Sequence, residues 1–225
     1  MQWPPWKRPR WYGQRGEDRR LAQLLAGRRR GFYVDVGAWD PVQDSTTKHF
    51  YDRGWRGINV EPHPRFAERL RATRPRDVTL QVALADAPGE KTLTLVGDSG
   101  LATFDPSLAR RAADWMRSNR PHPPLVEQIV VPVSTLAEVC AAHVPPGVEI
   151  DFLKVDVEGW EGAVLRGGDW QRFRPLVLLI EAVVPLGDEP AWQDWDGFVR
   201  DRGYAFLEFD GLNRWYRRAD ARVST

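Results

Sequence analysis

The sequence contains little of what marks a secreted or membrane protein. Among its 225 residues the only cysteine is Cys140, which excludes a framework of intrachain disulfides and favours the reducing cytoplasm. No apolar run approaches the roughly 18–20 residues that a membrane span requires. The first residues, MQWPPWKRPRW, lack the apolar core of a secretory signal. We therefore expect a cytoplasmic protein without a membrane span.

The chain also lacks an excess of charge of either sign. Its 32 Lys and Arg residues nearly balance its 31 Asp and Glu residues, and the formal net charge is +1. Because no recognition motif for nucleic acid is present either, we expect no nucleic-acid partner. Hydrophobic residues make up 42% of the chain and charged residues 28%, a balance that supports a sizeable globular core.

Predicted strands and helices alternate along most of the sequence. The strands are expected at 32–38, 56–62, 78–85, 151–158 and 175–183. Helices are expected between and after them, at 45–53, 64–73, 136–143, 160–166 and 190–202. Such alternation is typical of a doubly wound, mostly parallel α/β sheet, and 204–209 with 213–218 predicts a closing antiparallel hairpin.

The chain is expected to have two parts. Residues 1–30 are predicted to form an N-terminal arm, in which three prolines exclude a regular helix at 1–13, followed by a helix at 16–27 that packs on the body. Residues 31–225 form the main domain. Within it, strands at 92–96 and 129–133 flank the irregular segment 97–127, where we expect disorder and a lid or acceptor-binding loop.

Acidic residues stand at or near the ends of five successive strands. They are Asp35, Glu61, Asp86, Asp156 with Glu158, and Glu181. In an open α/β sheet the ligand lies beyond the carboxyl ends of the strands. A single aspartate there often only caps the next helix, but five strands ending in this way predict a binding site along one edge of the sheet.

The residues of this edge favour an adenosyl ligand. In the turn Asp35-Val36-Gly37-Ala38, glycine allows the backbone to approach a ligand closely. The dinucleotide motif G-x-G-x-x-G is absent, so nothing recruits a pyrophosphate. Glu61 can accept hydrogen bonds from both hydroxyls of a ribose, and Asp86 is placed to receive an adenine amino group. An acidic rim also suits a ligand with a positive centre.

Several longer motifs occur in a characteristic order. They are YGQRGED (12–18), GFYVDVGAWDP (31–41), DSTTKHFYDRGWRGINVEPHP (44–64), ALADAPGE (83–90), DFLKVDVEGWEGAVLRGG (151–168) and LLIEA (178–182). By these motifs the sequence resembles the FkbM family of S-adenosylmethionine-dependent methyltransferases. The resemblance implies a Rossmann-like class I methyltransferase fold and methylation of a hydroxyl on a sugar, a glycan or a glycosylated natural product.

The resemblance also implies site residues. Those expected around S-adenosylmethionine are Asp35, Gly37, Ala38, Ser45, Thr46, Glu61, Pro62, Ala85, Asp86 and Asp156. Asp156 and Glu158 are implied to lie between the cofactor and the acceptor.

A sugar hydroxyl must lose its proton during methyl transfer. Glu158 is the leading candidate for the base, with Asp156 and Glu181 close by, because grouped carboxylates raise one another's affinity for a proton. Lys154 is expected to offset their charge. Alternatively, Asp156, Glu158 and Glu181 hold a magnesium ion, which prefers oxygen ligands, although their spacing is not distinctive.

Other roles stay open. YGQRGED is either a helix start or a flap whose Gln14 or Glu17 closes over the site, and Trp39 and Trp160 are candidates for stacking on a sugar ring. The basic runs Lys7–Arg10 and Arg28–Arg30 are either solvated or bind an anionic acceptor, such as a nucleotide sugar or, in peripheral contact, a glycolipid head group. The competing function is a non-catalytic adenosyl-binding or scaffold protein of the same fold. The sequence indicates neither the acceptor nor the oligomeric state.

Overall fold

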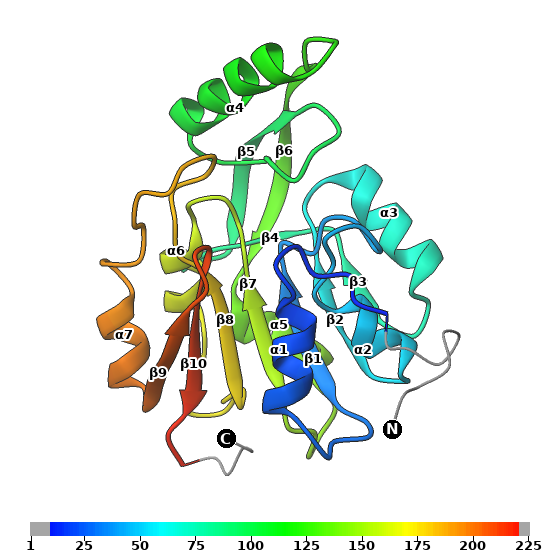
Figure 1. The fold of residues 1–225 in the computed structure, drawn as a ribbon, viewed down its shortest axis with the longest axis vertical. Coiled ribbons are helices and arrows are strands. Elements are labelled where there is room, and N and C mark those ends of the chain that lie inside the picture. Colours follow the sequence, from blue (N-terminus) through cyan, green and yellow to red (C-terminus); the bar gives the residue numbers. More distant parts are fainter. Residues whose placement is uncertain (1–9, 221–225) are drawn as a thin grey trace.

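A computed structural model describes residues 10–220 of the chain. The centre of the molecule is a seven-stranded sheet in the order β3-β2-β1-β7-β8-β10-β9 (Figure 1). Residues 1–9 of the predicted N-terminal arm lie outside the described residues.

The main sheet is parallel except at its C-terminal edge. The bounds of its strands are β1 (Phe32–Val36), β2 (Arg56–Val60), β3 (Val78–Leu80), β7 (Phe152–Val155), β8 (Val177–Glu181), β9 (Tyr204–Phe209) and β10 (Asn213–Arg218). Strand β10 runs antiparallel to both β8 and β9, whereas the pairs among β1, β2, β3, β7 and β8 are parallel. The predicted mostly parallel sheet with an antiparallel C-terminal hairpin is therefore confirmed.

Helices cover both faces of this sheet. On one face α1 (Glu17–Leu24) and α2 (Lys48–Asp52) bury apolar side chains against the strands. On the other face lie α5 (Leu136–His143), α6 (Glu161–Arg166) and α7 (Asp196–Asp201). A further helix, α3 (Pro64–Thr73), packs beside β3. In β1, Tyr33 joins the first layer while Val34 and Val36 join the second, as the alternation of an extended strand requires.

The predicted strand at 78–85 is wrong as a single element. It consists of β3, which belongs to the main sheet, and β4 (Ala83–Leu84), which belongs to a second sheet of order β4-β6-β5. Ala83 pairs with Val133 and Leu84 with Ser134. The alternation of apolar residues continues through both strands, but this local pattern carries no information about which strand each segment pairs with.

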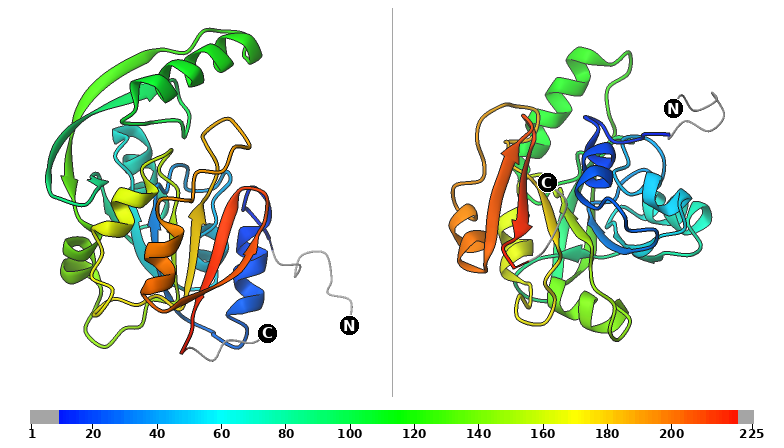
Figure 2. Two further views of the ribbon diagram at one scale, coloured as in Figure 1. Left: turned by 90° about the vertical axis from the view of Figure 1, so that its left-hand side faces the viewer. Right: turned by 60° about the horizontal axis from the view of Figure 1, so that its bottom comes forward.

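Residues 89–134 form a unit that we call the roof. Its strands β5 (Gly89–Val96) and β6 (Val126–Ser134) pair antiparallel along their length. Helix α4 (Pro106–Asn119) belongs to the segment that connects them in the sequence. Figures 1 and 2 show the roof curving over one end of the main sheet. The irregular segment expected at 97–127 therefore contains a helix of 14 residues, so the expected irregularity is wrong over α4.

Helix α4 is stabilised by its start and by one small-residue face. The side chain of Asp105 accepts a hydrogen bond of 2.7 Å from the backbone N–H of Ser107, and Pro106 occupies the first turn. Ala109, Ala112, Ala113 and Met116 form the buried face, which packs with Val96 and Leu101 in a cluster of its own. Three alanines make a weak apolar signal in a segment with many arginines, which is why the sequence pattern did not predict this helix.

None of the helices within 10–220 is long and apolar enough to cross a membrane.

Removing the cap of α4 should loosen the roof alone. We expect Asp105→Ala to destabilise α4 locally by about 1 kcal/mol, because the first turn loses a side-chain acceptor. Amide hydrogen exchange within α4 should then speed up about fivefold. Exchange in the core strand β7 serves as the internal control, because α4 packs in a separate cluster. Unchanged exchange in α4 would contradict the assigned cap.

Candidate active site

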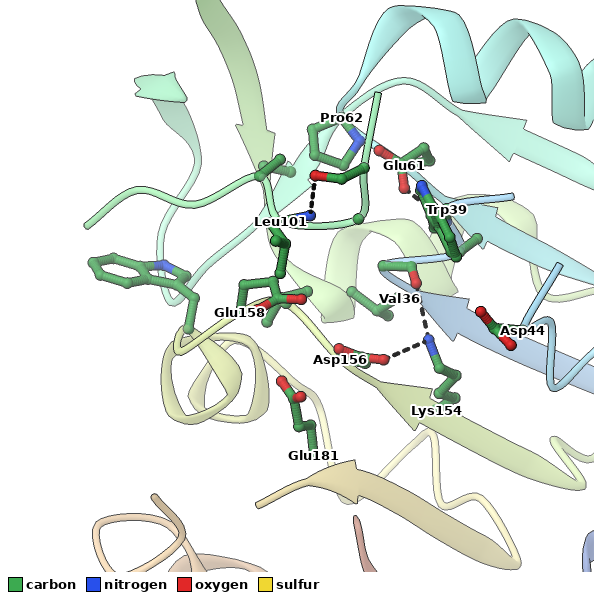
Figure 3. A pocket seen from close by; sticks show the side chains of 18 of the residues that line it. Val36, Trp39, Asp44, Glu61, Pro62, Leu101, Lys154, Asp156, Glu158 and Glu181 are labelled. Atoms are coloured by element: carbon green, nitrogen blue, oxygen red, sulfur yellow. Dashed lines mark hydrogen bonds and ion pairs between the residues drawn. The ribbon is translucent and has the colours of Figure 1, made fainter. Parts of the chain in front are cut away.

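A cavity of about 710 Å³ lies at the carboxyl ends of β1, β2, β7 and β8. Its walls include the turns that follow these strands, and residues 98–102 and Phe104 of the roof line it from the other side. Figure 3 shows the side chains that point into it, including Glu61, Pro62 and Glu158. The predicted edge of the sheet is therefore a concave site with a cover.

The turn after β1 is held tightly against β2 and β7. The backbone N–H groups of Gly37 and Ala38 donate to the carbonyl of Val60 at 3.0 and 3.2 Å. Gly37 has a φ of 78°, and a Cβ atom there would lie 1.7 Å from the carbonyl oxygen of Asp156. Only glycine can occupy this position, because any side chain would push β1 and β7 apart at the mouth of the cavity.

Glu61, directly after β2, is oriented by the backbone around it. One of its carboxylate oxygens accepts from the N–H of Trp39 and the other from the N–H of His63, both at 2.8 Å. Burial raises the pKa of Glu61 to about 7, although these two hydrogen bonds oppose the shift. Beside it, Val60, Pro62 and Leu84 give the cavity an apolar wall.

Lys154 is the cation at the centre of the site. It lies opposite Asp35 in the register of β1 and β7. Its Nζ is 2.9 Å from the carbonyl oxygen of Gly37, 3.2 Å from Asp156 and 3.5 Å from Asp35. Burial opposes the charge on Lys154, but the carboxylates of Asp156 and Asp35 outweigh it and raise its pKa above the usual range. Lys154 therefore stays charged and ties the glycine turn to Asp156.

Asp35 does not line the cavity, and it is supported from behind by a residue that the sequence did not single out. Arg74 is fully buried and donates to Thr47 Oγ1, to the carbonyl of Pro41 and to Ser45 Oγ at 2.5–2.6 Å. Thr47 in turn donates to Asp35 at 2.8 Å. No local motif marks an arginine after a helix as buried, so this residue could not be found from the sequence.

Ser45 and Thr46, which were expected around the cofactor, lie outside the cavity, and Ser45 belongs to the network of Arg74. Ser45 binds Arg74 and is buried, and Thr46 is also buried, but neither lines the cavity. The cavity is lined in this region by Gln43 and Asp44 instead. Ser45 thus helps to hold the loop through Arg74, and neither Ser45 nor Thr46 faces the cavity.

Three carboxylates meet at the other end of the cavity. Asp156 and Glu158 follow β7, Glu181 ends β8, and each offers an oxygen within 4.8 Å of the others (Figure 3). Burial, together with the charges of Asp156 and Glu161, raises the pKa of Glu158 well above its usual range. Burial and the charges of Asp156 and Glu158 do the same to the pKa of Glu181.

The turn that carries Glu158 is held by Glu161, which sequence reasoning missed. Glu158 has a φ of 55° and Gly159 a φ of 92°. One oxygen of Glu161 accepts from the N–H groups of Val157 and Gly159 at 2.9 and 3.2 Å. Thr103 of the roof donates to the carbonyl of Glu158 at 3.1 Å. The signal available was a glutamate in the first turn of a helix, where its negative charge is favourable.

Asp86 is not brought to the site. It is exposed on the turn after β4 and does not line the cavity, and Ala85 is buried outside it against Gly167. The physical reason is that β4 pairs with β6 and leaves the main sheet, so the residues after it no longer reach the shared edge. Val82, Ala83 and Leu84 line the cavity in this region, which offers an adenine ring apolar contacts instead of a carboxylate.

Aromatic residues and Gln14 complete the lining. Trp39 packs edge-on against Phe66, and Trp160 packs edge-on against Phe104 of the roof. The indole N–H groups of Trp39 and Trp160 are buried and have no hydrogen-bond partner within 10–220. Both rings line the cavity, as does Gln14.

The motif YGQRGED was expected to be either a helix start or a flap over the site, and its residues differ in this respect. Gln14 faces the cavity, whereas Glu17 is buried in the first turn of α1. Glu17 accepts from the N–H of Arg15 at 2.9 Å and from the side chain of Asn213 at 3.4 Å. Glu17 has a structural role, and Gln14 is the residue of this motif that a ligand can reach.

The basic run Arg28–Arg30 lies away from the cavity. Arg28 forms ion pairs with Glu149 at 2.9 Å and with Asp151 at 2.6 Å, beside the amino end of β7. No residue of the run lines the cavity. An acceptor bound in the cavity is therefore not held by these arginines.

The chain is similar to one family model and to several solved structures. The family model described as the methyltransferase FkbM domain matches residues 35–206. A TehB-like SAM-dependent methyltransferase from Corynebacterium glutamicum is 10% identical, with a TM-score of 0.46 over 90% of this chain and 87% of the other. Fibrillarin from Aeropyrum pernix, solved with bound S-adenosyl-L-methionine, is 13% identical, with a TM-score of 0.41 over 86% and 67%. No curated protein sequence matches the chain.

Substitution of Gly37 should test the tight turn. We expect Gly37→Ala to destabilise the protein by about 1–3 kcal/mol more than Gly27→Ala, as measured by urea unfolding. Gly27 is a matched control, because it also has a positive φ but nothing lies within 4 Å of an added Cβ. Both variants place an alanine at a positive φ and are strained by it, but only Gly37→Ala must also displace the Asp156 carbonyl. Equal losses would contradict the close approach of the two turns.

Proposed function

The chain belongs to the FkbM methyltransferase family, and from this premise we propose that it transfers a methyl group from S-adenosylmethionine to a hydroxyl of a sugar, a glycan or a glycosylated natural product. One observation carries the proposal. A single cavity has a glycine turn and the oriented carboxylate of Glu61 at one end, and the carboxylates of Asp156, Glu158 and Glu181 at the other.

The first end fits the cofactor. Gly37 and Ala38 line the cavity, so a ligand bound there lies against the backbone of the turn after β1. Glu61 already accepts two backbone N–H groups, and its remaining lone pairs are free for the two hydroxyls of a ribose. Pro62 and Leu84 supply apolar surface for an adenine ring. Asp156 and Lys154 line the cavity beyond the glycine turn, toward the reacting centre.

The cofactor supplies a methyl group on a positively charged sulfur. The acceptor oxygen forms a bond to the methyl carbon, and the carbon–sulfur bond breaks with its electron pair moving to sulfur. The acceptor O–H bond breaks as well, and the proton must move to a base. The chain contributes alignment of the two reactants, the acidic surroundings that suit a positive charge, and the base.

Glu158 is the proposed base. Its backbone is held by Glu161 and Thr103, which leaves the carboxylate to face the cavity. Asp156 is engaged by Lys154, whereas no ion pair or hydrogen bond involves the Glu158 carboxylate within residues 10–220. A carboxylate that is positioned but uncommitted is suited to take the acceptor proton.

The acceptor end suits a molecule with several hydroxyl groups. Carboxylates accept hydrogen bonds from hydroxyls, and three of them line this end of the cavity. The rings of Trp39 and Trp160 offer apolar surface to the C–H face of a sugar. Trp115 of α4 also lines the cavity and is 42% exposed, so an aromatic platform is available at its mouth.

Cofactor binding should depend on the ionisation of Glu61. Its pKa is raised to about 7, so the carboxylate is ionised above pH 7 and protonated below it. Because the ionised form accepts hydrogen bonds from ribose hydroxyls, we expect the affinity for S-adenosylmethionine to fall about tenfold between pH 8 and pH 6. Calorimetry of Glu61→Gln should show weak binding with a flat pH profile.

Glu68→Gln is the control for this experiment, because Glu68 is exposed on α3 and does not line the cavity. It should bind like the unmodified chain at every pH. Absence of binding in the unmodified chain would favour the scaffold function over the enzyme.

Turnover should depend on Glu158. We expect Glu158→Gln to lower the rate of methyl transfer by about 10²–10⁴-fold while cofactor affinity stays the same, because the side chain keeps its shape but cannot take a proton. The rate is measured by transfer of labelled methyl groups into an extract of the native host. Glu189→Gln, an exposed neighbour of the cavity, is the control. Near-normal turnover by Glu158→Gln would exclude it as the base.

The same assay tests the type of bond that is formed. Transfer to a hydroxyl gives a methyl ether, which survives mild alkali, whereas transfer to a carboxylate gives an ester, which is hydrolysed. We expect the label to stay on the product after alkaline treatment, and mass analysis of that product identifies the acceptor. Loss of the label as methanol would contradict O-methylation of a hydroxyl.

A further inference from the structure

The three carboxylates at the acceptor end form a compact donor set. Asp156, Glu158 and Glu181 come from the ends of neighbouring strands β7 and β8, and one oxygen of each lies within 4.8 Å of the others. Figure 3 shows their side chains converging on one region of the cavity. Three negative charges at this separation repel one another strongly unless a positive charge lies among them.

The positive charge available from the chain is insufficient. Lys154 Nζ lies 3.2 Å from Asp156, but it also lies 3.5 Å from Asp35 and is shared between them. Within residues 10–220, neither Glu158 nor Glu181 takes part in an ion pair with a lysine, arginine or histidine. Counting Asp35 with the three carboxylates, one lysine faces four acids.

Glu181 is the clearest sign that something is bound here. Only 7% of its surface is exposed, and its Oε2 atom has no hydrogen-bond partner among the described residues. Burying a carboxylate without a partner is costly. The fold does not explain the cost, because Glu181 caps no helix and its backbone is already paired with β10. An unpartnered, buried oxygen of Glu181 beside two other carboxylates is therefore suited to bind a cation.

Glu158 is fixed in position toward the same point. Its backbone has a φ of 55°, a left-handed conformation that is unfavourable for a non-glycine residue, and Glu161 and Thr103 hold the turn in place. The donor set is therefore arranged before any ligand arrives, which lowers the cost of binding one.

The donor atoms define the class of cation. All three are carboxylate oxygens, and neither the imidazole of a histidine nor Cys140 is among them. Hard divalent cations such as Mg²⁺ and Mn²⁺ prefer such ligands, and they commonly bind through a few carboxylates while water or substrate oxygens complete the shell. The open side of the cluster faces the cavity, where an acceptor hydroxyl would take one of these places.

We propose that Asp156, Glu158 and Glu181 bind one Mg²⁺ or Mn²⁺ ion at the acceptor end of the cavity, an inference that rests on the proposed function for the role of the ion. The ion would orient the acceptor hydroxyl and make its proton easier to remove. Each carboxylate contributes one oxygen, so the second oxygen of Glu158 is left to accept that proton. In this proposal Glu158 both binds the ion and acts as the base.

Binding of Mn²⁺ to the full chain, without cofactor or acceptor, tests the site directly. The protein is first treated with a chelator, and free Mn²⁺ is then followed by electron paramagnetic resonance during titration. We expect one Mn²⁺ per chain and displacement by Mg²⁺. Loss of an outer partner typically weakens metal affinity about 10–100-fold, and loss of the ligand Glu181 in Glu181→Gln should weaken it at least as much.

Asp188→Asn is the matched control, because Asp188 is an exposed carboxylate that lines the cavity mouth outside the cluster. It should bind Mn²⁺ like the unmodified chain. Thermal unfolding and cofactor calorimetry of Glu181→Gln establish that the variant is folded. Absence of stoichiometric Mn²⁺ binding by the unmodified chain, or equal weakening in both variants, would overturn the proposal.

The outcomes separate this proposal from the proposed function. Mn²⁺ binding without any binding of S-adenosylmethionine would support the cation site and contradict the methyltransferase. Methyl transfer that persists in chelator, together with no Mn²⁺ binding, would overturn the cation site and leave the methyltransferase intact. We expect both kinds of binding, and transfer that stops in chelator and returns when Mg²⁺ is added.

Discussion

The site depends on the buried ammonium group of Lys154. Its three contacts join the carbonyl of Gly37, the carboxylate of Asp35 and the carboxylate of Asp156. Without this cation, the carboxylates of Asp35 and Asp156 would lie near each other without a positive charge between them, and their repulsion would lower the stability of the fold. With it, the turns after β1 and β7 are held together, so the end of the cavity at Gly37 and Glu61 is fixed relative to the end at Asp156, Glu158 and Glu181.

Support for this ion pair extends well behind the cavity. Arg74 holds Thr47, and Thr47 donates to Asp35, so a chain of buried polar contacts runs from the end of α3 to Lys154. Such networks are stable only when most members have partners. Buried polar atoms without a hydrogen-bond partner among the described residues occur within this network, at Asp35 Oδ1 and Arg74 Nε, and also at the cavity, at Glu181 Oε2 and the indole nitrogens of Trp39 and Trp160.

Much of the fold could be predicted from local patterns. The strands around Asp35, Glu61, Asp156 and Glu181 lie where the apolar runs predicted them, and the C-terminal hairpin is confirmed. The roof could not be predicted, because α4 is buried through alanines and its strands pair across 29 intervening residues, between Val96 and Val126. Asp86 was misplaced for the same kind of reason, since β4 pairs outside the main sheet.

By itself the sequence determined the class of fold, the family and the presence of carboxylates at the ends of the parallel strands, because apolar periodicity, turn residues and motifs are local properties of the chain. Only the tertiary structure decided which of those carboxylates meet. Lys154 and Gly37 are 117 residues apart, and their contact follows from the pairing of β1 with β7 and its register. Strand order and register depend on the packing of the whole core, so the choice of Asp156, Glu158 and Glu181 over Asp86 could be made only there.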